Sequence, residues 1–149
     1  MAHRNGSLDA KAERASLDWQ AVWRSSLAPF IVWAALVILV SFVERQPGVV
    51  CITPVAWVLG CWVGMACVAR SRSASRPALL KEAGVAGAAL GFLQGILFIV
   101  ITAFLTEIKP DEWRKAIFMW LAMLFAGTLI TAVVSVAVGA AQARRRRAQ

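Results

Sequence analysis

The chain has 149 residues, of which 60% are hydrophobic and 16% charged, and its formal net charge is +8. Soluble domains average roughly 45–50% apolar and about 25% charged residues, so this composition predicts an integral membrane protein. The basic residues gather at the N-terminus, in Arg70–Lys81 and in Arg144–Arg147, between apolar runs long enough to cross a bilayer. That alternation follows the positive-inside rule and, without an aromatic-interleaved basic groove, argues against nucleic-acid binding.

Residues 1–26 form a polar N-terminal segment in which apolar residues recur at helical spacing, namely Leu8, Ala12, Ala15, Trp19 and Val22. This spacing predicts an amphipathic helix that lies on the cytoplasmic membrane surface. Trp19 and Trp23 are then expected at the level of the lipid headgroups, where tryptophan is enriched. A frayed tail is the alternative interpretation of this segment.

Four apolar spans follow, with predicted ranges 27–43, 49–69, 84–105 and 116–140. Pro29 opens the first span, where a missing N–H costs least. Trp113, just before the fourth span, is expected at the outer interface. Residues 141–149 form a basic cytoplasmic tail, and anionic lipid is the expected partner of its four arginines, Arg144, Arg145, Arg146 and Arg147.

The predicted fold is therefore an all-α four-helix transmembrane bundle with an N-terminal amphipathic interfacial helix. Because the long basic loop and both ends carry Lys and Arg, we expect both termini in the cytoplasm. The expected location is a bacterial inner (plasma) membrane, with the chain as a multi-pass protein.

Small residues recur every fourth position along three of these spans. They are Gly60 and Gly64 in the second span, Ala83, Gly87, Gly91 and Gly95 at and within the third, and Gly127, Thr131, Ser135 and Gly139 in the fourth. Residues four apart lie on one face of a helix. Inside a bilayer, such a face lets a second backbone approach closely, and packing replaces the missing hydrophobic drive. We expect spans two to four to pack tightly through these helix-packing residues and span one to lie at the periphery.

An offset of 63 residues superimposes several residues of the two halves: Glu44 on Glu107, Pro47 on Pro110, Trp57 on Trp120 and Gly64 on Gly127. One interpretation is a duplicated helical hairpin, with the copies related by an axis along the membrane normal. The other is chance matching between apolar sequences of restricted alphabet, and both interpretations stay open.

The four predicted spans contain no His, Asp, Glu, Lys or Arg, and the single histidine of the chain is His3. Haem and non-haem iron commonly require such ligands, and quinone chemistry requires a proton donor. We therefore predict no enzymatic activity, no catalytic or metal-binding residue and no cofactor of the chain's own, with contact to bound lipid or pigment left open. Cys51, Cys61 and Cys67 fall on different helical faces and are interpreted as small buried hydrophobes.

Gln94 stands out within the third span, because an amide in hydrocarbon needs a hydrogen-bond partner. A bond to a neighbouring helix is the first interpretation and a ligand contact the second. The predicted function is a non-catalytic accessory or scaffold subunit that binds other integral membrane subunits, with an electron-transfer or light-harvesting complex as first choice. The alternatives are a small dimeric carrier and a membrane-protein assembly factor. A polar midplane cavity lined by Gln94 or Thr131 would favour the carrier.

Overall fold

The computed structural model describes residues 17–44, 52–70, 76–105 and 108–147, and this part of the chain is all-helical, with four helices and no strand. The helices are α2 (Trp19–Glu44), α3 (Ile52–Arg70), α4 (Arg76–Leu105) and α5 (Trp113–Arg147). The all-helical prediction is confirmed. The predicted amphipathic helix falls largely on residues 1–16, which lie outside the described residues.

Three of the four helices are long and apolar enough to cross a membrane. Their apolar segments are Trp19–Leu39 in α2, Pro77–Phe104 in α4 and Trp113–Arg145 in α5. The apolar segment found in α3, Trp57–Arg70, is shorter. These helices agree with the predicted membrane protein.

α2 begins well before the first predicted span. The Asp18 carboxylate accepts a hydrogen bond from the Ala21 backbone N–H at 3.1 Å, and its carbonyl oxygen accepts one from the Val22 N–H at 3.0 Å. Asp18 is therefore the N-cap of the helix, a position that aspartate favours. Pro29 consequently lies inside α2 and not in its first turn. Trp19 to Ser26 belong to the same continuous helix as the first predicted span.

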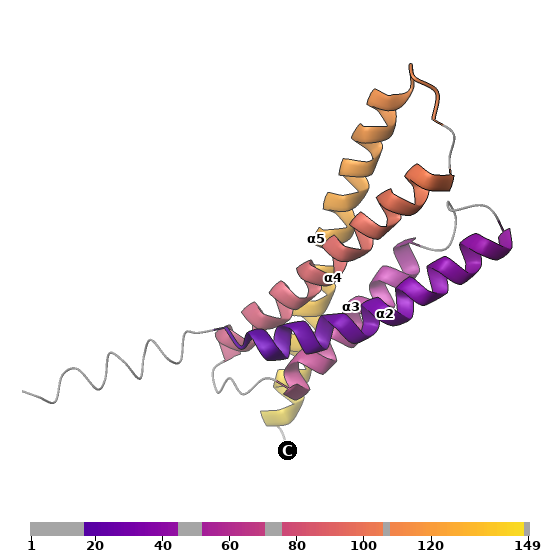
Figure 1. The fold of residues 1–149 in the computed structure, drawn as a ribbon. Coiled ribbons are helices and arrows are strands. Elements are labelled where there is room, and N and C mark those ends of the chain that lie inside the picture. The colour runs from indigo at the N-terminus through magenta and orange to yellow at the C-terminus, as the bar shows by residue number, and fades with distance from the viewer. Residues whose placement is uncertain (1–16, 45–51, 71–75, 106–107, 148–149) are drawn as a thin grey trace, which may run out of the picture.

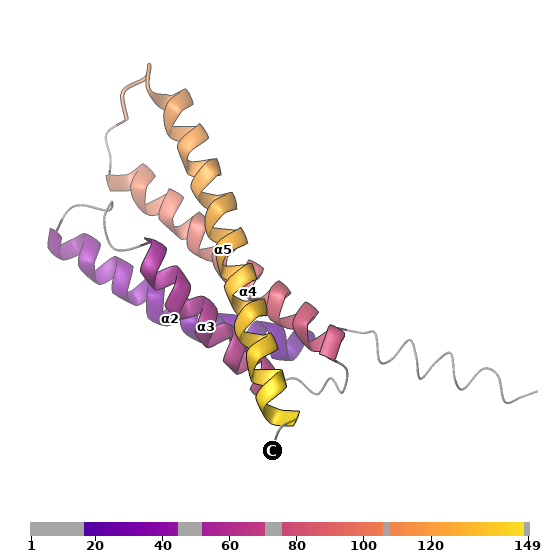
Figure 2. The ribbon, with the colours of Figure 1, turned by 180° about the vertical axis from the view of Figure 1, so that it is seen from behind.

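Figures 1 and 2 show how the four helices are arranged. α4 and α5 cross in the most extensive contact of the described residues, and α3 packs against the other three helices. α2 packs on α3 and α4, and its backbone does not come close to that of α5 within the described ranges. In both views the N-terminal half of α5 stands away from α2 and α3.

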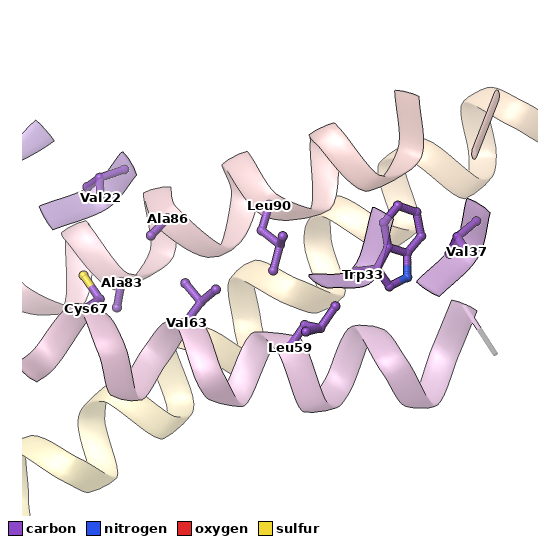
Figure 3. Packing of buried hydrophobic residues seen from close by; sticks show 9 residues of the cluster. All are labelled: Val22, Trp33, Val37, Leu59, Val63, Cys67, Ala83, Ala86 and Leu90. Atoms are coloured by element: carbon purple, nitrogen blue, oxygen red, sulfur yellow. The ribbon is translucent and has the colours of Figure 1, made fainter. Parts of the chain in front are cut away.

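The hydrophobic core lies between α2, α3 and α4 (Figure 3). Leu59 and Val63 of α3 meet Leu90 of α4, while Trp33 and Val37 of α2 close one end of the cluster. α2 thus contributes to the core, but its backbone packs on α3 and α4 only, and Ile31, Val32 and Leu39 are exposed, which agrees with a first span at the periphery. Its contribution to the core comes from bulky tryptophan and valine side chains and not from a small-residue face.

Candidate functional site

The crossing of α4 and α5 is a contact between backbones. A Cβ atom built on Gly87 would lie 2.6 Å from the Thr131 carbonyl oxygen and 2.7 Å from the Ser135 Cβ. A Cβ on Gly91 would lie 2.7 Å from the Thr128 Cα and would also meet the Thr131 hydroxyl. Real Cβ atoms essentially never approach that closely, so the crossing requires glycine at both positions.

α3 makes a second close contact with α5. A Cβ on Gly64 would lie 2.6 Å from the Ser135 carbonyl oxygen, and one on Gly60 would lie 3.1 Å from the Val134 Cγ1. The structure thus brings Ser135 between the small-residue faces of both α3 and α4. Two further stripe glycines also lie at contacts, Gly95 against Leu124 and Gly139 against Ala83.

Gly127 differs from the other glycines of the stripes. A Cβ built on it would meet nothing within 4 Å, although its carbonyl oxygen lies 2.8 Å from the Cβ position of Gly91. Gly64, which the offset of 63 residues pairs with Gly127, meets the α5 backbone instead. Equal spacing in the sequence therefore does not give equal environments, because the two helices present these glycines to different neighbours.

The hydroxyl groups of the α5 stripe bond in two ways. The buried Ser135 hydroxyl donates to the Ala83 carbonyl oxygen of α4 at 2.8 Å, which joins the two helices. The Thr131 hydroxyl donates to the Gly127 carbonyl oxygen of its own helix at 2.8 Å, and Thr128 does the same to Leu124 at 2.7 Å. Of these three, Ser135 is thus the hydroxyl that links α5 to α4.

A small cavity of about 30 Å³ lies beside the crossing. It is lined by residues of three helices, among them Trp33 of α2, Gly91, Gln94 and Gly95 of α4, and Met123 and Gly127 of α5. Gln94 is 7% exposed, and its side-chain nitrogen Nε2 is buried without a hydrogen-bond partner within the described structure. The bond from Gln94 to a neighbouring helix, which the sequence favoured, is therefore absent for this nitrogen. Thr131 is not among the lining residues.

Sequence reasoning missed a buried carboxylate near the N-terminal end of α4. Glu82 is 1% exposed, and its Oε1 accepts a hydrogen bond from the Asp18 backbone N–H at 3.1 Å. Glu82 lies two residues before the third predicted span, 84–105, and span lengths alone do not predict that its side chain is buried. One sequence signal does indicate its burial: Glu82 directly precedes Ala83, the first residue of the small-residue stripe. At the C-terminal end of α3, the Arg70 guanidinium donates a hydrogen bond to the Arg24 carbonyl oxygen of α2 at 2.8 Å.

The residues predicted at the interfaces lie near the helix ends. Trp19, Trp23 and Trp113 are exposed, and the Trp113 ring also packs edge-on against Trp120 with ring centroids 6.1 Å apart. Arg144 and Arg145 are exposed, whereas the side chains of Arg146 and Arg147 lie outside the described residues.

Cys67 is buried and Cys61 half-buried, both as free thiols, and Cys51 is outside the described ranges. Within the described ranges, no three His, Cys, Asp or Glu residues gather as metal ligands would. Compared with known proteins, the chain matches no family model, no curated protein and no solved structure. Any functional conclusion therefore depends on the geometry of the helices.

Proposed function

We propose that the chain is a non-catalytic accessory or scaffold subunit that packs against another integral membrane protein. One observation carries this proposal, the large apolar surface on the outer half of the α4–α5 hairpin. We define this outer surface by four exposed residues: Phe104, Phe118, Leu121 and Phe125. The three phenylalanines are 86%, 76% and 72% exposed.

The exposure runs nearly all the way round the N-terminal half of α5. At about 100° per residue, Ile117, Phe118 and Met119 point in three directions, and all three are exposed. Trp120 is the buried residue of this turn. Lipid can cover such a helix, but another helix offers closer packing, which is what stabilises helix association within a bilayer. A partner subunit is therefore the cover that we propose.

The proposed topology is four crossings with both termini cytoplasmic. α3 has 19 residues, or about 28 Å at ~1.5 Å per residue, which nearly matches a hydrocarbon core of about 30 Å. The hydrogen bond between Arg70 at the end of α3 and Arg24 near the start of α2 supports placing both of these helix ends on the same, basic side of the membrane. Cysteine labelling in a cysteine-free background tests the topology. An impermeant reagent outside whole cells should react at Lys109→Cys and not at Arg144→Cys, and the reverse pattern would invert the orientation.

The cavity beside the crossing bears on the carrier alternative. It holds about 30 Å³, while one water needs about 10–15 Å³ of such space, so it has room for about two waters. Gln94 is the polar side chain among its lining residues. This size and lining support the subunit over the carrier. Substrate transport by the purified chain in proteoliposomes would instead favour the carrier.

Deletion of the chain tests the proposed function. We expect a specific membrane complex to become less abundant in the deletion strain, as measured by quantitative proteomics of native membranes. The same complex should contain the tagged full-length chain in fixed stoichiometry after mild-detergent purification. A loss confined to early stages of complex formation would identify an assembly factor. Unchanged membrane complexes and a chain that purifies alone would contradict the proposal.

A further inference from the structure

One end of the bundle gathers exposed cationic side chains from all four helices. The start of α2, the end of α3, the start of α4 and the end of α5 lie together there (Figures 1 and 2). We call this end of the molecule the basic end. Its exposed cationic residues are Arg24, Arg70, Lys81, Arg144 and Arg145.

A contact between three helices fixes the level of these cations. A Cβ on Gly139 of α5 would lie 3.3 Å from the Ala83 Cβ of α4 and 3.6 Å from the Val68 Cγ2 of α3. Arg70 lies two residues (68 to 70) beyond this contact on α3, which is about 3 Å along the axis. On α4, the ammonium-bearing residue 81 lies two residues (83 to 81) before it, again about 3 Å. Because α4 begins where α3 ends, both steps lead toward the basic end.

Two of the cations share one position on α2. The Arg70 Nη1 donates to the Arg24 carbonyl oxygen at 2.8 Å, which holds the Arg70 guanidinium against α2. A guanidinium has five N–H donors, so this bond leaves others for a further acceptor. The exposed Arg24 side chain starts from the same residue. Neither arginine forms a salt bridge with a carboxylate of the described residues. The pair therefore calls for an anion from outside the described chain.

The position of the pair along the helices indicates which anion is present. Arg24 lies three residues (24 to 27) before the first predicted span, 27–43, and Arg70 directly follows the second, 49–69. Trp23, the neighbour of Arg24, is exposed, and tryptophan is enriched at the level of the lipid headgroups. The anions of that level are the phosphates of phospholipids, and the guanidinium fork matches phosphate oxygens.

We propose that Arg24 and Arg70 bind the headgroup phosphate of an anionic phospholipid in the leaflet at the basic end. Arg70 donates its remaining N–H groups to one phosphate oxygen, and Arg24 donates to another. The other cations of the basic end favour a headgroup that is negative overall and disfavour one that carries a choline cation.

This lipid site differs from the attraction of the C-terminal arginines to anionic lipid, because it requires the folded contact between α2 and α3. It involves the chain alone and is independent of the proposed partner subunit.

The test is native mass spectrometry of the purified full-length chain with equal amounts of phosphatidylglycerol and phosphatidylcholine of distinguishable mass. We expect phosphatidylglycerol to be retained in preference. A basic residue near anionic lipid contributes about fivefold in affinity, so the Arg24→Gln, Arg70→Gln double variant should bind phosphatidylglycerol about 25-fold more weakly. Its binding of phosphatidylcholine should not change.

Two further double variants remove the same charge elsewhere. Lys109→Gln, Arg114→Gln removes two exposed cations at the opposite end of the bundle and should keep the preference. Arg144→Gln, Arg145→Gln removes two exposed cations of α5 and should weaken the preference less than the loss of the arginine pair.

The single Arg24→Gln variant separates lipid binding from folding. It keeps the backbone carbonyl that Arg70 binds, so the contact between α2 and α3 persists while phosphatidylglycerol binding falls about fivefold. Helix content and thermal stability of every variant are measured by circular dichroism.

Several results would overturn the lipid site. An equal loss of preference in the Arg24→Gln, Arg70→Gln and Lys109→Gln, Arg114→Gln variants would show an effect of net charge alone. Displacement of phosphatidylglycerol by excess inorganic phosphate would indicate a site for a soluble anion. Unchanged lipid binding with loss of the native partner in the Arg24→Gln, Arg70→Gln variant would assign the pair to acidic residues of that partner.

Discussion

The C-terminal half of α5 presents small residues to α3 and α4, whereas its N-terminal half presents large apolar side chains that are mostly exposed. Thr131 and Ser135 are fully buried, and their backbone carbonyl oxygens lie against Gly87 of α4 and Gly64 of α3. Phe118 and Phe125 lie on the same helix and are largely uncovered. In a bilayer, where burial of apolar surface gives little drive, close backbone approach holds the chain together and bulky side chains remain for other contacts.

The largest expected effect comes from adding a methyl group at the crossing. Gly91→Ala places a Cβ against the Thr128 backbone, and overpacking of this kind costs typically about 1–3 kcal/mol. Gly127→Ala is the matched control, because its Cβ meets nothing within 4 Å and alanine favours the helix. The free energy of unfolding is measured by denaturing-detergent titration. An equal loss of unfolding free energy in both variants would show that close backbone packing at Gly91 is not the cause.

A smaller effect is expected at the buried end of α4. Glu82→Ala removes the acceptor of the Asp18 N–H bond. Because Asp18 is half-buried, water can replace part of this bond, and we expect a loss of about 1 kcal/mol, typical of a single hydrogen bond. Glu82→Gln keeps an acceptor oxygen and should lose less. Glu112→Ala is the control at an exposed carboxylate. The same unfolding titration checks these variants, and an unchanged Glu82→Ala would show that this bond does not secure the start of α2.

The interhelical hydroxyl should matter less than either of these. Ser135→Ala removes the bond to Ala83, and such bonds in membrane proteins contribute about 0.6 kcal/mol on average and up to about 1.7 kcal/mol. Thr128→Ala removes a bond within α5 and should change the free energy of unfolding by less. A larger loss for Thr128→Ala would mean that bonds within the helix outweigh the bond across the crossing.

The smallest effect on the chain itself is expected on the outer surface. Phe118→Ala removes an exposed ring, and such changes usually shift the free energy of unfolding by within about 0.5 kcal/mol. The unfolding titration of the purified chain measures this shift. A loss comparable to that of Gly91→Ala would show that Phe118 stabilises the chain itself and would remove the contrast between the two halves of α5.

The helices themselves could be predicted because long apolar runs and basic flanks are local signals. The four-residue spacing also placed Gly87 and Gly91 on one face of α4. The environments of Gly127 and Gln94 could not be predicted, since they depend on which helix face α5 and α2 present at that level. Glu82 was missed for a related reason: its burial depends on α2 continuing through Trp19 to the Asp18 cap, which span lengths alone do not reveal.

The central claim is that the outer surface binds a partner subunit, while the crossing of α4 and α5 stabilises the fold of the chain itself. The most direct test is the mass of the native complex, measured by native mass spectrometry after mild-detergent extraction, for a Phe118→Ala, Phe125→Ala double variant. Phe92→Ala serves as a control at an exposed phenylalanine of α4 outside the outer surface. We expect the double variant to lose the partner while its own helix content and abundance persist, and the control to keep the partner. An intact complex in the double variant would contradict the account.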